Sequence, residues 1–168
     1  MSITSLAPVT RDVRDLLTAE ELVAVTATVQ LNNPVMATRL AEAIVLEAVK
    51  FEAACASNPS GRLVPSRVVD EGWHALILHT RVKAALASRL GYFVHHVPEA
   101  PDPGRRDPNV LLATQAAIEA AGYVPDPKLW GGPSDTSIPV AASCQHSPGG
   151  PEGSCAGSGE GDGPSGPN

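Results

Sequence analysis

The sequence predicts an all-α fold: a small helical domain of about four helices, followed by a disordered tail rich in glycine and proline. Three observations support this prediction. Apolar residues recur at helical spacing through most of the first 130 residues. Capping residues and glycines stand at the expected ends of these stretches. The composition then changes sharply after Trp130. We therefore divide the 168-residue chain into a helical domain, residues 1–130, and a tail, residues 131–168.

The first two helices are predicted on either side of an Asn-Asn-Pro turn at residues 32–34. Residues 18–21, Thr-Ala-Glu-Glu, form a capping box, and apolar residues follow it at helical spacing. Pro34 is expected to start the second helix, which extends to about Ala56. Its apolar stripe repeats every three or four residues and consists of Leu40, Ile44, Ala48, Phe51 and Cys55.

The third and fourth helices are predicted from their caps. Ser66 is a suitable N-cap for a helix from Arg67 to about Leu90, and Gly91 suits the position just after it. Residues 107–108, Asp-Pro, are typical of the N-cap and first position of a helix, and Gly122 ends this fourth helix.

The tail has a composition that cannot form a core. It holds ten glycines and six prolines but no aromatic residue, so burial cannot offset the entropy of ordering it. Four of the six net negative charges lie there, which leaves the helical domain near neutrality. Cys144, His146 and Cys155 offer soft metal ligands, but their spacing matches no standard zinc module.

Composition excludes several classes of protein. Twelve basic residues against eighteen acidic ones give no footprint for nucleic acid. No apolar run is long enough to span a membrane, and the first residues lack the apolar region of a secretory signal. We therefore expect a cytoplasmic protein that has neither nucleic acid nor membrane as a partner.

Chemistry-bearing residues concentrate in and just after the third predicted helix. Asp70 and His74 are four residues apart and share a helix face, with Trp73 beside them. His95 and His96 follow a few residues after the helix. Two histidines and one carboxylate are the ligands of a facial iron triad or of an open zinc site.

The length of the third helix limits which of these residues can meet. In a straight helix, His74 lies roughly 25 Å from Gly91, and the chain from Gly91 to His95 can return at most about 14 Å. Asp70, His74 and His95 therefore form one site only if the helix breaks early. His95 and His96 remain the weaker metal candidates, with hydrogen bonding to carbonyl groups near Gly91 as their alternative role.

The second helix offers another ligand. If the second and third helices pack antiparallel, Glu47 lies about one turn from the position opposite His74. Glu47, Asp70 and His74 are thus candidates for a divalent-metal site of the helical-bundle type. The alternative is purely structural: Asp70 suits the positive end of the helix dipole, and His74 keeps it in register with a neighbouring helix.

The same residues carry a resemblance to a known family. The sequence is similar to bacterial members of the glycine-rich domain-containing protein-like family over about residues 40–130. Where relatives tend to have Tyr and Phe-Cys in the signature helix, this chain has Lys83, Leu86 and Ala87. The resemblance implies the helical fold and the choice of residues, but it supplies no reaction. The matching segments are Glu47, Lys50 and Phe51, then residues 63–66, 69–71, 73–74, Thr80, Gly91, 93–96, Pro98, 121–123 and 129–130.

Two functions follow as expectations. The first is a small helical binding or interaction module that presents the Asp70-Trp73-His74 cluster to a protein partner or a small ligand. The alternative is an iron- or zinc-dependent enzyme, or a metal-binding protein, that uses Asp70 and His74.

Overall fold

The computed structural model describes residues 10–96, 109–132 and 134–141. Within these ranges the fold is all-α, as predicted, with five α-helices and no strand. The helices are α1 (Ala19–Asn32), α2 (Thr38–Ser57), α3 (Arg67–Leu78), α4 (Thr80–Leu90) and α5 (Val110–Ala120), with short 3-10 helices η1 (Val13–Leu16) and η3 (Pro127–Leu129). None of these helices is both long enough and apolar enough to cross a membrane.

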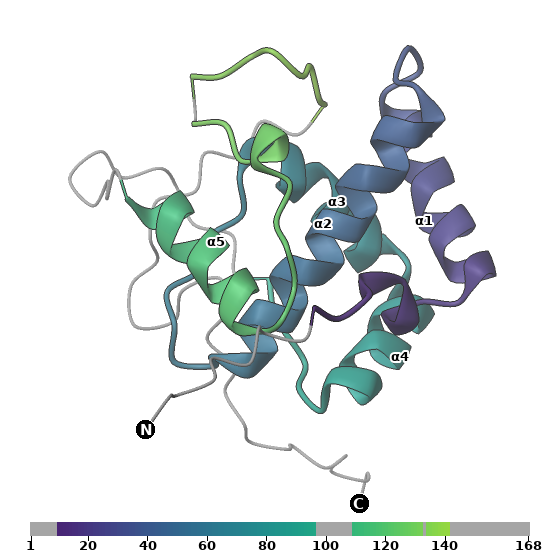
Figure 1. The fold of residues 1–168 in the computed structure, drawn as a ribbon. Helices are drawn as coiled ribbons and strands as arrows, with labels where there is room; N and C mark the ends of the chain where they lie inside the picture. The colour runs from purple at the N-terminus through teal and green to yellow at the C-terminus, as the bar shows by residue number, and fades with distance from the viewer. Residues whose placement is uncertain (1–9, 97–108, 133, 142–168) are drawn as a thin grey trace, which may run out of the picture.

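Helix α2 is the centre of the domain. It packs against α1, α3, α5 and η1, and Figure 1 shows α1 and α5 on opposite sides of the α2–α3 pair. The predicted stripe explains this position, because Ile44, Phe51 and Cys55 are fully buried and Leu40 packs at the edge of the core. The burial of α2 also extends to two carboxylates, Glu47 and Glu52, each 1% exposed.

Several predicted helix ends are confirmed. Thr18 and Glu21 form the capping box of α1, and the Ser66 hydroxyl accepts a hydrogen bond from the Val69 amide at the start of α3. Gly91 has a φ of 73°, the left-handed conformation that ends a helix and that glycine adopts without strain. Gly122, which follows α5, also has a positive φ.

Two predicted boundaries are wrong. Helix α2 begins at Thr38 and not at Pro34. The buried Asn33 side chain donates hydrogen bonds to the Val29 carbonyl and to the Glu71 carboxylate, and the residues that follow Asn33 form a turn before the helix starts. The single helix predicted from Arg67 to Leu90 is two helices, α3 and α4, interrupted at His79. Residues 107–108, predicted to start the fourth helix, lie outside the described residues.

Residues 134–141, which the sequence assigns to the tail, contact the helical domain. The Arg67 guanidinium donates to the Ile138 carbonyl at 2.9 Å, and the Ala141 amide donates to the Asn33 side chain at 2.8 Å. Ile138 and Val140 pack against the core. The packed part of the chain therefore extends past Trp130 to Ala141, and residues 142–168 lie outside the described ranges.

Helix α3 packs closely against the backbone of α2 at Gly72. A Cβ atom at this position would lie 2.7 Å from the Ile44 carbonyl oxygen, a backbone atom that cannot move alone. We expect Gly72→Ala to lower the free energy of unfolding by about 1–3 kcal/mol, although alanine in an exposed helix is better than glycine by about 1 kcal/mol.

Urea denaturation of Gly72→Ala tests this expectation. Gly132→Ala serves as the control, because its Cβ would meet nothing within 4 Å, and it should change stability by less than about 0.5 kcal/mol. A Gly72→Ala protein as stable as the parent would show that the two helices do not need this close approach.

Candidate metal centre

Asp70 and His74 form the part of the site that lies on one helix. Asp70 stands in the first turn of α3 and is fully buried, whereas the His74 side chain is 37% exposed. The His74 Nδ1 atom lies 3.2 Å from the Asp70 carboxylate and 2.9 Å from the Asp70 backbone carbonyl. The predicted contact between residues four apart is therefore present, and it fixes the orientation of the imidazole.

His96 completes a group of three. Asp70, His74 and His96 each offer one ligand atom, and these atoms all lie within 4.8 Å of one another. The imidazole rings of His74 and His96 have centroids 4.9 Å apart. Among the residues that the structure describes, this is the one group of three or more His, Cys, Asp or Glu side chains that meets this distance.

The break at His79 makes this convergence possible. His79 has a φ of −88° and a ψ of 67°, which interrupts the helix, and its Nε2 atom lies 2.7 Å from the Thr28 hydroxyl of α1. Helix α4 therefore starts afresh at Thr80, and Gly91 turns the chain after it. The segment after Gly91 can then return to the start of α3, which the length of one straight helix would prevent.

Trp73 supports His96 from the side of the core. The fully buried indole lies against the His96 ring, with centroids 4.8 Å apart, and packs nearly perpendicular to the Phe51 ring, with centroids 5.1 Å apart. The indole Nε1 atom donates a 2.7 Å hydrogen bond to the Glu52 carboxylate. The ring orientation is thus held on two sides, and it presents a fixed apolar surface to His96.

Glu52 also accepts from the Lys83 ammonium, which belongs to α4. Both side chains are buried. Burial raises the pKa of Glu52 and lowers the pKa of Lys83, in each case against the attraction of the partner. This ion pair connects α2 to α4, and Lys83 also lies over the rings of Trp73 and Phe93.

The electrostatics of the triad favour positive charge. The hydrogen bond from His74 to Asp70 raises the pKa of His74 above its ordinary value, although partial burial opposes the shift. Glu71, 3% exposed, adds a further negative charge that raises the pKa of His74. A cation is therefore stabilised here, whether it is a proton on His74 or a metal ion.

Glu47 does not belong to the group, contrary to the antiparallel-packing argument. Its carboxylate accepts hydrogen bonds from the Trp130 indole at 2.7 Å and the Asp126 amide at 3.1 Å, and it pairs with Lys50 at 2.7 Å. These partners use both carboxylate oxygens. The sequence does not predict the hydrogen bond from Trp130 to Glu47, because the two residues are 83 positions apart and no local pattern connects them.

His95 also lies outside the group. It is exposed, and its ring contacts Phe93 with centroids 4.8 Å apart. The sequence offers His95 and His96 together as the weaker metal candidates, and of the two the structure brings His96 alone to Asp70 and His74. The tail residues Cys144, His146 and Cys155 lie outside the described residues.

The geometry suits a small transition-metal ion. Ligands of a tetrahedral zinc ion are separated by about 3.3 Å, since metal–ligand bonds measure about 2.0–2.2 Å. The three ligand atoms lie within 4.8 Å of one another, so a bound ion would draw the more distant ones closer. Three protein ligands leave at least one coordination position for water or substrate, and the exposed side of His74 faces solvent.

Comparison of the chain with protein-family models, with curated proteins and with solved structures found no match. The resemblance to the glycine-rich domain-containing protein-like family therefore stays a prediction.

Proposed function

We propose that this protein binds one divalent transition-metal ion, zinc or iron, through Asp70, His74 and His96. The observation that supports this proposal is the approach of the three ligand atoms to within 4.8 Å of one another. A carboxylate and two imidazoles are ligands that both metals accept.

The surroundings of the triad also support a metal site. Asp70 lies in the first turn of α3, and the Trp73 indole packs against the His96 ring. Fixed ligands lower the entropic cost of binding. The open coordination positions would let the ion act as a Lewis acid toward a small ligand. An interaction module that binds no metal is the competing function.

Zinc titration by calorimetry tests the proposal with two neighbouring histidines. The full-length chain should bind one Zn²⁺. His96→Ala should weaken binding by at least about 100-fold, since even outer-shell changes cost about 10- to 100-fold. His95→Ala is the matched control and should bind like the parent, because His95 lies outside the triad.

Two outcomes would contradict the proposal. A parent chain that binds no zinc and no iron(II) would favour the interaction module. Equal zinc affinity in the parent and in folded His96→Ala would place the metal elsewhere. Far-UV circular dichroism of both variants establishes that they are folded.

A further inference from the structure

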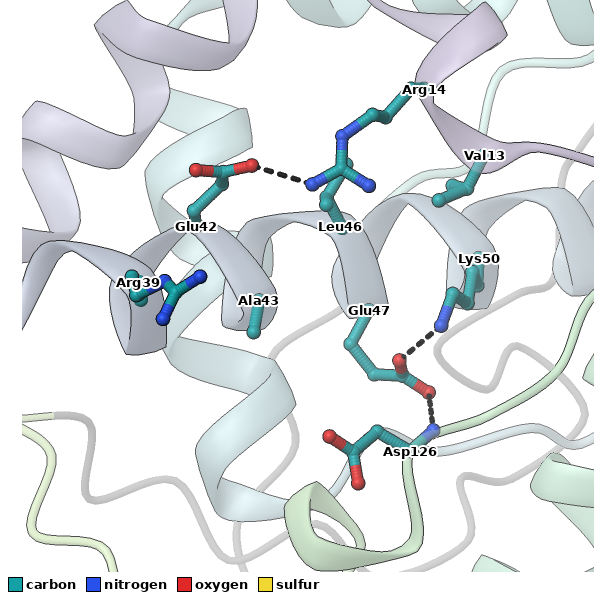
Figure 2. Close-up of a pocket in the computed structure, with 9 residues that line it drawn as sticks. All are labelled: Val13, Arg14, Arg39, Glu42, Ala43, Leu46, Glu47, Lys50 and Asp126. Carbon is teal, nitrogen blue, oxygen red and sulfur yellow. Dashed lines mark hydrogen bonds and ion pairs between the residues drawn. The ribbon is translucent and has the colours of Figure 1, made fainter.

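A second site, separate from the triad, lies where η1, α2 and the residue before η3 meet. The cavity has a volume of about 310 Å³, which is within the range of small-molecule sites. Its lining combines charged and apolar side chains, as Figure 2 shows. The lining residues are Val13, Arg14, Arg39, Glu42, Ala43, Leu46, Glu47, Lys50 and Asp126.

The cavity lining carries equal numbers of basic and acidic side chains, and four of these six form two ion pairs. Arg14 pairs with Glu42 at 2.7 Å, and Lys50 pairs with Glu47 at the same distance. One cation and one anion remain, Arg39 and Asp126. Arg39 makes no hydrogen bond or ion pair in the described part of the chain. Asp126 uses one carboxylate oxygen to cap the Lys128 amide.

These two groups are separated along the length of α2. The Asp126 backbone amide donates a hydrogen bond to the Glu47 carboxylate. Glu47 in turn follows Arg39 by eight residues, which is about 12 Å along α2. Figure 2 shows Ala43 on the helix between them. The apolar part of the lining, which we call the apolar floor, consists of the side chains of Val13, Ala43 and Leu46.

From this arrangement we propose that the cavity binds a small linear zwitterion. The Arg39 guanidinium would hold the carboxylate of the ligand in a charge-assisted, bidentate contact. The free oxygen of Asp126 would accept from its ammonium group, and a methylene chain would cover the apolar floor. An ω-amino acid has this chemistry, whereas a ligand with one charge leaves one of the two charged groups unmatched.

Nuclear magnetic resonance with three matched probes tests the proposal. The probes are ε-aminocaproate, caproate, which lacks the ammonium, and hexylamine, which lacks the carboxylate. We expect ε-aminocaproate to cause saturable shifts in the methyl signals of Val13, Ala43 and Leu46. Each singly charged probe should bind at least about tenfold more weakly than ε-aminocaproate, which is the effect of losing one charge-assisted hydrogen bond.

Variants identify the two charged contacts. Arg39→Gln and Asp126→Asn should each weaken binding of ε-aminocaproate about tenfold, and the asparagine retains an oxygen that caps Lys128. Arg81→Gln, an exposed arginine of α4 outside the cavity, is the control and should bind like the parent. The proposal is overturned if ε-aminocaproate causes no saturable shift, if caproate or hexylamine binds equally well, or if Arg39→Gln binds unchanged.

Discussion

Replacement of Lys83 by methionine is expected to lower the free energy of unfolding by about 3–5 kcal/mol. The change leaves the Glu52 carboxylate buried without its cation, and among the described residues the Trp73 indole is the donor that remains. Urea denaturation at neutral pH measures the loss. The large effect is expected because removal of one partner exposes the full desolvation cost of the other.

The double variant Glu52→Gln/Lys83→Met separates this explanation from simple loss of packing. Glutamine carries no charge, and its carbonyl oxygen can still accept from the Trp73 indole. We expect the double variant to recover most of the stability lost in Lys83→Met, since no buried charge remains. A loss in the double variant equal to the sum of the two single losses would contradict the coupling.

The stability deficit of Lys83→Met should also depend on pH. Burial already raises the pKa of Glu52 above its ordinary value, and loss of the lysine raises it further. A carboxyl with a raised pKa contributes stability below its unfolded pKa and loses that contribution as pH rises through the folded value. The deficit relative to the parent should therefore shrink on acidification. A deficit that does not change with pH would show that Glu52 carries no charge to compensate.

Phe51→Ala is expected to cost about 3–5 kcal/mol of stability. The Phe51 side chain belongs to α2 and is fully buried, and its ring packs nearly perpendicular to the Trp73 indole with centroids 5.1 Å apart. Its removal therefore leaves a cavity in the core. Thermal or urea unfolding of the purified variant measures the effect.

Phe93→Ala is the matched control for this prediction. Phe93 is 42% exposed, so its substitution should cost about half as much or less, in proportion to the area removed from water. A loss below about 1 kcal/mol in Phe51→Ala would show that this face of α2 does not pack as described.

Features set by local chemistry could be predicted from the sequence. The caps at Thr18 and Ser66 and the left-handed glycine at position 91 act within a few residues, and all three are confirmed. The buried positions Ile44, Phe51 and Trp73 follow from helical spacing and the size of the side chains. Such signals need no knowledge of the tertiary structure.

The candidate site could be predicted only in part, because its geometry depends on a tertiary contact. Asp70 and His74 share a turn of helix, so their proximity follows from their spacing. His96 can reach the other two ligands only because the helix is interrupted at His79. No proline or glycine at this position indicates the interruption, and the hydrogen-bond partner of His79, Thr28, belongs to another helix. The surroundings of Glu47 depend on tertiary contacts in the same way, since Trp130 and Asp126, which donate hydrogen bonds to it, lie about 80 residues further along the chain.

X-ray absorption at the zinc edge of the metal-loaded full-length chain tests the central claim most directly. We expect only nitrogen and oxygen neighbours at about 2.0–2.2 Å, including the scattering pattern of two imidazoles. His96→Ala should lose one imidazole, and His95→Ala should match the parent. Sulfur neighbours at about 2.3 Å would contradict the account, because the Asp70, His74 and His96 triad contains no sulfur ligand.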